Sequence, residues 1–441
     1  MTSPALPVSD WRALDDDARA RLLRRPARLE ESDTRERVRG IVRRVRESGD
    51  RALFEMTESF DRVLLKSLAV TVTERDAAAD SLDGAVRKAL DAAIATVTAF
   101  HAAQRTPPLA METAPGVVCE RIELPIDRVG LYVPAGDAPL PSTAIMLAAP
   151  ARIAGCRRRV LCTPPRADGR PDPAVLYVAR VCEIDEIFRI GGAQAIAALA
   201  YGTATVPRVD KIFGPGNTWV MAAKQQVAAD PDGAVCDLPA GPSEVLVIAD
   251  DSAPPAFVAA DLLAQAEHSS EAQVILVSDS LRLIQRVNDE LPRQVAARRR
   301  SSVITAALAL GRAILVPDLA TAVEVSNCYA PEHLIIATAR PRDWLAQVRA
   351  AGSVFLGHWT PEVLGDYCSG TNHVLPTHGY ARSCSGLSLN DFTRRMTVQQ
   401  ATAEGLAGLG PVAQQLALLE GLDAHAYAVS VRLPVTPEAA A

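Results

Sequence analysis

The sequence predicts an α/β protein with two incomplete Rossmann-like parallel sheets, and two observations support this. From residue 129 to residue 356, short apolar or β-branched runs alternate with segments of helical periodicity, a pattern typical of parallel sheets covered by helices. The runs are also more numerous than one open sheet comfortably holds, so we expect two α/β units. The expected strands are 129–133, 160–162, 184–190, 211–213, 245–248, 274–277, 314–316, 333–336 and 354–356.

The regions on either side show different patterns. Residues 11–103 have helical periodicity interrupted by a β-rich piece at 68–72, and the charged start up to Arg25 indicates an arm rather than a core. After residue 357 a polar, glycine-rich stretch runs to about residue 390, and helices are expected across 391–409 and 411–428. With 441 residues, 49% of them hydrophobic, the chain is long enough for two or three cores.

Composition and charge disfavour several classes of partner. The net charge is −6 and basic side chains are interspersed with acidic ones, which argues against nucleic acid. The first fifty residues contain no apolar run of the secretion-signal type, and no stretch is apolar for long enough to span a membrane. We therefore expect no membrane partner and a cytoplasmic location. The eight cysteines form no C-x-x-C pair and are expected to be reduced thiols.

Two expected strand-to-helix junctions, at 189–194 and 212–217, carry glycines where the backbone must turn tightly. A helix that begins just after such a turn directs free N–H groups at an anion above the strand ends, as in dinucleotide-binding sheets. Neither junction has the G-x-G-x-x-G spacing, and glycines also occur at such turns for purely steric reasons. Tyr132 adds an aromatic surface to the same crevice or is simply core.

Candidate metal ligands begin with Gln265 and His268, which lie three apart and so share one face of a helix. An imidazole beside oxygen donors suits zinc or a similar divalent ion, but a polar helix end with a satisfied histidine has the same sequence. Asp366 and His425 would add a carboxylate and a second imidazole. Asp366 and His425 lie far from Gln265 and His268 in sequence, so the spacing does not decide between a metal site and a purely structural role.

Glu332 and His333 stand at a junction between a helix and an apolar strand. A carboxylate can orient water and an imidazole can move a proton, which are the two roles needed to oxidise an alcohol through an aldehyde. A glutamate capping the sheet edge beside a buried histidine is the alternative. From these residues alone the two interpretations weigh equally.

A series of segments spread over residues 130–425 resembles the motifs of the histidinol dehydrogenase family, in the family's order. The segments are GGAQAIAALAYGT at 191–203, FGPGN at 213–217, DLPAGPSE at 237–244, QAEH at 265–268, YAPEH at 329–333, GDY at 365–367, NHVLP at 372–376 and EGLDAH at 420–425. So many ordered blocks are far more specific than any one of them.

The resemblance implies an enzyme that uses one zinc ion per subunit and NAD to oxidise L-histidinol to L-histidine through histidinal, the last step of histidine biosynthesis. Glu332 and His333 match the family's acid–base pair. The family's zinc ligands, which also contact substrate, correspond to Gln265, His268, Asp366 and His425. Further substrate contacts correspond to Ser243, His333, His373 and Glu420, and NAD contacts to Tyr132, Gln194 and Asn217.

The resemblance also implies a homodimer with shared active sites, in which His425 completes the partner's zinc site. We expect an N-terminal helical arm at 1–30 and a first α/β domain at 31–129 and 243–387, which carries most metal and catalytic residues. The NAD-binding α/β domain is expected at 130–242, and the boundary between the two α/β units is expected near 236–242, where proline and glycine interrupt the alternation of strands and helices. A helical appendage at 388–441 would contribute to the partner's site.

Three other functions remain as alternatives. A dehydrogenase of the same fold could act on another polar alcohol, such as a sulfonated diol. A zinc hydrolase would use Glu332 and a metal-bound water, but would leave the glycine junctions and Tyr132 without a purpose. A non-catalytic scaffold would make every candidate residue a coincidence. A nucleophilic cysteine, Cys328 or Cys368, is disfavoured because nothing in the sequence shows either thiol to be activated.

Overall fold

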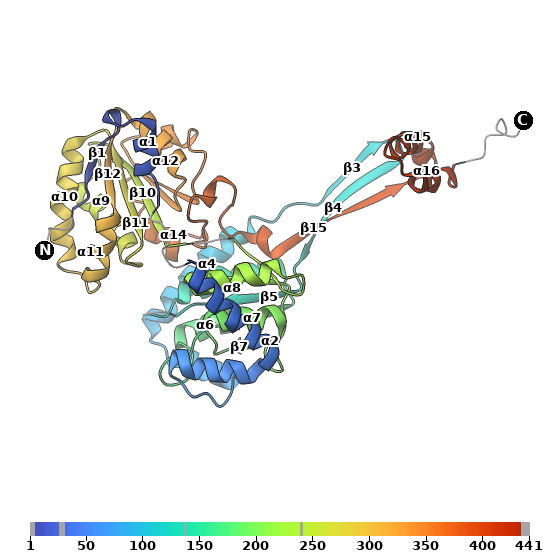
Figure 1. The fold of residues 1–441 in the computed structure, drawn as a ribbon, viewed down its shortest axis with the longest axis horizontal. Helices are drawn as coiled ribbons and strands as arrows, with labels where there is room; N and C mark the ends of the chain where they lie inside the picture. The colour runs from blue at the N-terminus through green and yellow to red at the C-terminus, as the bar shows by residue number, and fades with distance from the viewer. Residues whose placement is uncertain (1–4, 26–30, 136–137, 239–240, 434–441) are drawn as a thin grey trace, which may run out of the picture. The chain divides into compact units, whose positions relative to one another are not determined.

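The computed structural model describes residues 5–25, 31–135, 138–238 and 241–433, and the side chains of residues 31 and 32 are not included. The chain divides into two compact units, each described by itself. Unit 1 comprises Met1–Ala103 and Asp127–Phe392, and unit 2 comprises Gln104–Ile126 and Thr393–Ala441. Unit 1 contains two six-stranded, largely parallel sheets covered by helices, which confirms the predicted fold class (Figure 1).

The first sheet of unit 1, the 128–236 sheet, has the strand order β2-β7-β6-β5-β8-β9. All neighbours are parallel except β2, which pairs antiparallel with β7. From β5 the chain moves first to one side of the sheet and then to the other, the arrangement that leaves a crevice at the carboxyl ends of the strands. The strands are β2 (Ala69–Val70), β5 (Arg128–Tyr132), β6 (Arg158–Cys162), β7 (Glu186–Phe188), β8 (Lys211–Phe213) and β9 (Val235–Cys236).

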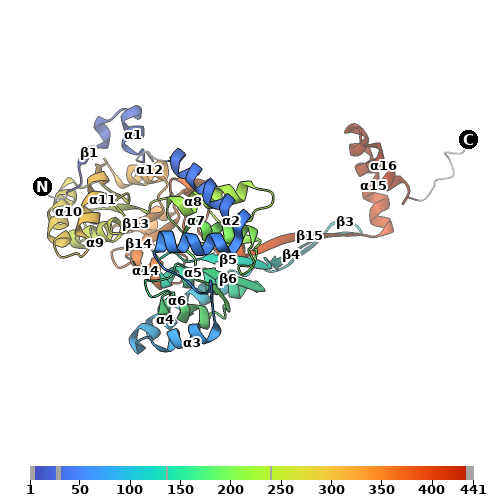
Figure 2. The same cartoon turned by 60° about the horizontal axis from the view of Figure 1, so that its bottom comes forward.

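Helices cover both faces of the 128–236 sheet. Figure 2 shows α2, α7 and α8 on one side of β5 and β6, and α4, α5 and α6 on the other. Nearly every residue of α7 is buried, because its alanines allow the helix to pack closely against both the sheet and its neighbours. The helices are α2 (Glu31–Asp61), α3 (Val72–Asp80), α4 (Gly84–Ala102), α5 (Pro141–Ala154), α6 (Pro173–Val181), α7 (Gly192–Tyr201) and α8 (Thr218–Ala229).

The second sheet, the 244–356 sheet, has the order β1-β12-β11-β10-β13-β14 and is parallel throughout. Every residue of β10 and β11 is buried, because helices cover both faces and leave no side of these strands to solvent. The strands are β1 (Val8–Asp10), β10 (Glu244–Ala249), β11 (Gln273–Ser278), β12 (Arg312–Leu315), β13 (His333–Ala337) and β14 (Ser353–Leu356).

Alternate side chains of this sheet enter two separate cores. Val245 and Val247 pack with α9, α10 and α11, whereas Leu246 and Ile248 pack with α12 and with Leu22 of the N-terminal arm. The helices are α1 (Asp16–Leu22), α9 (Pro255–Ala266), α10 (Leu281–Val295), α11 (Ser301–Leu310), α12 (Leu319–Tyr329), α13 (Arg342–Leu345) and α14 (Glu362–Tyr367), with short 3-10 turns at Trp11–Ala13, Tyr380–Arg382 and Leu389–Phe392.

The predicted domain grouping differs from the structure in two places. Residues 31–129 were expected with 243–387, but α2 packs on α7 and α8, α3 packs on α6, and β2 joins β7, so residues 31–103 belong with the 128–236 sheet. The N-terminal arm is also not purely helical, because β1 pairs with β12. Periodicity shows which face of a helix is apolar but not which sheet that face will cover. Residues 1–4 and 26–30 of the arm lie outside the described part of the chain.

Unit 2 consists of a three-stranded antiparallel sheet, β15-β4-β3, and two helices. The prediction of helix across 391–409 is wrong for residues 393–401, which form β15 and pair residue by residue with β4. A partner from a distant part of the sequence therefore overrode the local pattern. The elements are β3 (Leu109–Ala114), β4 (Val117–Pro125), β15 (Thr393–Ala401), α15 (Ala403–Leu419) and α16 (Asp423–Ser430); residues 434–441 of the expected appendage are not described.

Two further expectations concern membranes and thiols. Within the described residues, no helix combines the length and the apolar character needed to cross a bilayer. All eight cysteines are free thiols, and only Cys156, Cys162 and Cys182 are fully buried.

Candidate active site

Unit 1 contains a cavity of about 630 Å³ between its two sheets. Tyr132 ends β5 and reaches the cavity from the carboxyl end of the 128–236 sheet, whereas His333 begins β13 and reaches it from the amino end of the 244–356 sheet. The 128–236 sheet thus presents its carboxyl end, where α/β sheets typically bind nucleotides. The 244–356 sheet presents its amino end, where the helices that precede its strands terminate. The predicted site residues that line the cavity are Tyr132, Gln194, Asn217, Ser243, His268, Glu332, His333, Asp366 and His373.

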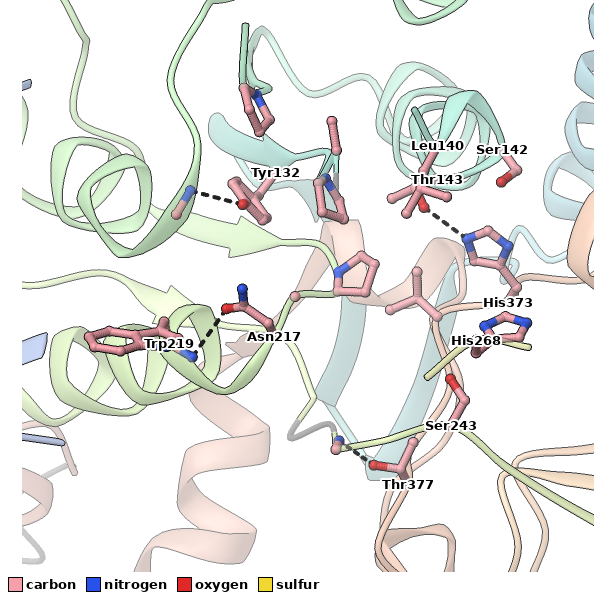
Figure 3. Close-up of a pocket in the computed structure, with 18 of the residues that line it drawn as sticks. Tyr132, Leu140, Ser142, Thr143, Asn217, Trp219, Ser243, His268, His373 and Thr377 are labelled. Atoms are coloured by element: carbon pink, nitrogen blue, oxygen red, sulfur yellow. Dashed lines mark hydrogen bonds between the residues drawn. The ribbon is translucent and has the colours of Figure 1, made fainter. Parts of the chain in front are cut away.

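The first glycine junction, after β7, leads directly into α7. Gly192 has a φ of 66°, and a Cβ there would lie 2.7 Å from the Gln194 Oε1 atom, so a side chain would be strained and crowded. The Gly192 N–H donates a hydrogen bond of 3.0 Å to the Tyr132 hydroxyl (Figure 3). The N-terminus of α7 has no side-chain cap, and its first residues line the cavity.

The second glycine junction, after β8, is held by a buried ion pair. Gly214 has a φ of 131°, and a Cβ there would lie 2.1 Å from the Tyr132 carbonyl oxygen, so only glycine fits. Its N–H donates to Asp237 (2.7 Å), its carbonyl accepts from Lys224 (2.8 Å), and those two side chains pair with each other. Asn217 caps α8 by accepting from the N–H groups of residues 219 and 220, each at 3.1 Å.

On the opposite side of the cavity, Glu332 and His333 are both buried and both bonded to the backbone of Glu244. The Glu244 N–H donates to a Glu332 carboxylate oxygen at 2.8 Å, and the His333 Nδ1 atom lies 3.0 Å from the Glu244 carbonyl. A carbonyl oxygen only accepts, so Nδ1 carries a proton, and in the neutral form of the ring Nε2 is left as a base. His333 is thereby oriented for proton transfer through Nε2.

The charge around this pair is predominantly negative. Burial raises the pKa of Glu332 to about 8. Burial alone would lower the pKa of His333, but the carboxylates of Glu332 and Glu362 outweigh it and raise that pKa to about 10. A cation bound beside these carboxylates would offset their effect and return the ring to its neutral form. Such an excess of carboxylates around one imidazole is an environment that favours a bound cation.

A cluster of potential metal ligands adjoins His333. His268 follows the C-terminal end of α9, where the helix dipole also favours positive charge. Glu362 and Asp366 lie four apart on α14, so they share a face of that helix. Ligand atoms of His268, Glu362 and Asp366 all lie within 4.8 Å of one another, and the Asp366 Oδ1 atom lies 3.4 Å from the His333 Nε2 atom.

The donor set of this cluster fits a divalent cation such as zinc. Gln265 precedes His268 by three residues and is not among the described residues that line the cavity. It is fully buried, yet neither atom of its amide has a hydrogen-bond partner among the described residues, and the same holds for both oxygens of buried Glu362. Unpaired buried polar atoms are costly unless a ligand satisfies them. His268 is exposed, so its imidazole is accessible to an incoming ion.

His373 closes one side of the cavity. Its Nδ1 atom bonds the Asp366 carbonyl at 2.7 Å, and its Nε2 atom lies 3.3 Å from the Thr143 hydroxyl, as Figure 3 shows. Burial lowers its pKa, so the ring is neutral. Ser243 precedes β10 and lies on the same side as His268 (Figure 3).

The structure does not bring every predicted residue to this cavity. Glu420, at the end of α15, and His425, on α16, belong to unit 2 and are exposed. Cys328 and Cys368 are exposed, and neither is among the described residues that line the cavity.

Sequence reasoning missed Glu362. The spacing of Glu362 and Asp366 is a helical signal, but the polar, glycine-rich surroundings concealed a helix of only six residues. Four-residue spacing of two carboxylates next to an expected metal ligand was the available clue.

Two largely parallel sheets, with glycine junctions on one side of a cavity and Glu332 and His333 on the other, are typical of an α/β oxidoreductase. A family model described as histidinol dehydrogenase matches residues 24–433. Histidinol dehydrogenase of Xanthomonas campestris pv. campestris is 56% identical over 426 residues, covering 97% of this chain and 99% of that protein. The enzyme of Vibrio cholerae is 51% identical, covering 96% and 97%.

The comparison of structures agrees. The crystal structure of histidinol dehydrogenase from Elizabethkingia anophelis matches this chain with a TM-score of 0.94 and 41% sequence identity, over 98% of both chains. The chain belongs to the histidinol dehydrogenase family, as its motifs predicted.

Proposed function

We propose that this protein oxidises L-histidinol to L-histidine in two successive steps, with NAD and one zinc ion per subunit. The observation that supports this best is a single cavity that holds both glycine junctions, the pair Glu332–His333 and the ligand cluster around Asp366. Cytoplasmic histidine biosynthesis is the corresponding setting.

In this proposal Gln265, His268 and Asp366 hold the zinc ion, and the partner subunit supplies a fourth ligand equivalent to His425. Bound zinc supplies a fixed positive charge for the substrate's nitrogens, and bound NAD accepts one hydride in each oxidation. The amide of Gln265 then gains the partner that it otherwise lacks. Glu362, which has a carboxylate oxygen within 4.8 Å of ligand atoms of His268 and Asp366, would place a second carboxyl group beside the same ion.

The NAD half of the cavity is formed by Tyr132, Gln194 and Asn217. The N–H groups of Ala193 and Gln194, which follow Gly192 in the uncapped first turn of α7, lie on this half and suit an anionic pyrophosphate. Tyr132 is oriented by its hydrogen bond from Gly192, so its ring presents a fixed surface. Ser243 and His373 lie on the substrate side, and Glu420 of the partner would complete it.

The first oxidation uses His333 as a base. Its Nε2 atom takes the hydroxyl proton of the alcohol while the carbon-bound hydrogen leaves as hydride, and an aldehyde results. The Glu244 carbonyl fixes the Nδ1–H tautomer and stabilises the imidazolium that forms. His333 then returns its proton to solvent.

The second oxidation uses Glu332 to activate water. The carboxylate takes a proton from water as the water oxygen bonds to the aldehyde carbon, and His333 takes a second proton as the next hydride leaves. The loss of two hydrides to NAD and the addition of one water convert the alcohol into a carboxylate, which accounts for all four electrons.

We further propose that the protein is a homodimer with shared sites. Among the described residues of unit 2, only Gly405, Gly410 and Ala426 are buried. Large apolar side chains on α15 and α16 are exposed, including Leu416, Leu419 and Tyr427. A unit with so little core of its own is typical of an element that packs against another chain.

The test is the number of NADH molecules formed per L-histidinol consumed, with zinc, after chelation and after zinc is restored. Two NADH per substrate, lost on chelation and recovered with zinc, are expected. An enzyme that binds NAD and zinc but forms no NADH from histidinol would have another polar alcohol as its substrate. An enzyme that fails to bind NAD would instead support the hydrolase alternative.

A further inference from the structure

Glu244, the last residue of the 237–244 motif, connects the acid–base pair to the N-terminal arm. Its backbone bonds both Glu332 and His333, as described above. Its side chain is 1% exposed and carries a carboxylate, which accepts a hydrogen bond of 3.1 Å from the backbone N–H of His378. The peptide that orients the catalytic pair therefore belongs to a residue with a buried charge.

Arg25, from the arm, is the counter-ion of that charge. Its guanidinium makes two parallel hydrogen bonds to the Glu244 carboxylate, one through Nε and one from Nη2 at 2.7 Å. The same Nη2 atom lies 3.0 Å from the Tyr329 carbonyl and 3.3 Å from the Ala330 carbonyl, and the guanidinium lies 3.9 Å from the centre of the Tyr329 ring. A planar fork of this kind fixes direction as well as distance.

The contacts of Arg25 join the two backbone segments that set the geometry of the pair. Glu244 begins β10, and Tyr329 and Ala330 form the turn that leads through residue 331 to Glu332. Ala330 has a φ of 54°, a left-handed conformation that needs support from its surroundings. Arg25 bonds the carbonyl groups on this turn and the carboxylate on the neighbouring strand at the same time.

The arm itself is fixed to the 244–356 sheet and its helices. β1 pairs with β12, and the backbone of Leu6 makes two hydrogen bonds with the amide of Asn288, at 2.9 and 3.0 Å. Arg312 donates to the Leu22 carbonyl. Arg25 is consequently fixed through the backbone that precedes it and through its guanidinium.

We propose that Arg25 is a positioning residue for catalysis: through Glu244 and the 329–330 turn it holds Glu332 and His333 in register with the substrate. The inference rests on the proposed function, because it assigns a role within the same acid–base chemistry. It gives the N-terminal arm a function in catalysis besides packing.

The test compares Arg25→Met and Arg25→Lys with the wild-type enzyme, as zinc-loaded full-length protein. Arg25→Met is expected to lower kcat about 100-fold, the effect of an approximately 1 Å displacement of catalytic groups, while KM for histidinol and NAD changes less than about threefold. Arg25→Lys keeps the charge but loses the fork, so an intermediate loss of about tenfold is expected. Arg24→Gln, at the adjacent exposed arginine, is the control and leaves kcat unchanged.

A double variant separates positioning from stability. Arg25→Met leaves the Glu244 carboxylate buried without its counter-ion, and adding Glu244→Gln removes that charge. We expect the melting temperature to recover in the double variant while kcat stays low. Recovery of kcat together with stability, or single variants with wild-type kcat, would overturn the proposal. A wild-type enzyme that forms no NADH from histidinol would instead refute the proposed function.

Discussion

Glu332 and His333 are adjacent in sequence, but their surroundings give them different capacities. Both bond the backbone of Glu244, yet Glu332 accepts from its N–H and His333 donates to its carbonyl. The same peptide thereby holds Glu332 as a hydrogen-bond acceptor and His333 as a donor, with the His333 Nε2 atom directed towards Asp366. From residue type alone, either side chain could accept the proton of the alcohol or the proton of the attacking water.

The division of labour between these residues can be tested with Glu332→Gln. This change removes the base that activates water, so oxidation of L-histidinal should fall by about 10²–10⁴-fold, whereas oxidation of the alcohol should change much less. Single-turnover rates of NADH formation from each substrate measure the two steps separately. Glu324→Gln, at an exposed carboxylate on α12, is the control. Equal loss of both steps would contradict separate roles.

Asp61 gives a pH-dependent prediction at the other end of the cavity. Burial raises its pKa from 3.8 to about 6, and its Oδ2 atom has no hydrogen-bond partner among the described residues. Between pH 4 and 6 the folded state therefore keeps a proton that the unfolded chain has released, so the free energy of unfolding falls as pH rises through this window.

Asp61→Asn should remove this penalty. The variant is expected to be about 1–2 kcal/mol more stable than the wild type at pH 7, a value reduced for partial exposure, and to be equal to it near pH 4. Urea unfolding of the ligand-free protein at both pH values measures the difference. Glu58→Gln, at an exposed carboxylate on the same helix, should show no such change. A constant difference at both pH values would rule out titration as the cause.

At the scale of elements, helix ends and short turns place the chemistry. The C-terminal end of α9 supplies His268, the six residues of α14 supply Glu362 and Asp366, and the turn after β8 supplies Asn217. Each of these segments needs contacts from other parts of the chain. A very short helix is not stable by itself, and a glycine loses much conformational entropy when its backbone is fixed.

The turn at Gly214 shows how large that support is. Lys224 and Asp237 are a buried pair, each almost fully inaccessible, and both bond the backbone of Gly214. Lys224→Met should destabilise the protein by about 3–5 kcal/mol, because it leaves a buried carboxylate unpaired. It should also weaken NAD binding at the same turn.

Urea unfolding and an NAD titration measure the two effects of Lys224→Met. Lys66→Met, at an exposed lysine between α2 and β2, is the matched control and should alter neither stability nor NAD binding. Adding Asp237→Asn removes the unpaired charge and should restore part of the stability. A single variant as stable as the control would show that the pair does not hold the turn.

At the scale of the whole molecule, unit 2 has too few buried residues to be stable by itself. Its helices expose apolar side chains, and it carries Glu420 and His425, which the family resemblance assigns to the partner's site. The shared-site proposal accounts for both observations, because a second chain would cover the apolar surface and receive the two polar residues.

A mixed dimer of Glu332→Gln and His425→Ala chains tests this arrangement. If sites are shared, each mixed dimer contains one site with both changes and one intact site. Random pairing should then restore about one quarter of wild-type histidine formation. Each parent alone should be nearly inactive. Mixing after folding without exchange of subunits is the control, and no recovery after co-expression would show that each chain builds its own site.

Much of this protein could be predicted from sequence because the relevant patterns are local. Alternation of apolar runs with helices predicted both sheets of unit 1, since a strand buried on both faces must be apolar throughout. The motifs around Gln265, Glu332 and Asp366 identified the family, since chemistry restricts residue type at each position.

Other features depend on contacts between residues far apart in the chain. The pairing of β15 with β4, the packing of α2 on α7 and α8, and the place of Glu362 in the ligand cluster required the tertiary structure. The same holds for the link from Arg25 through Glu244 to His333. Sequence determines what a residue can bind, but packing decides which partner it meets, because burial energy depends on the neighbour and not on the separation along the chain.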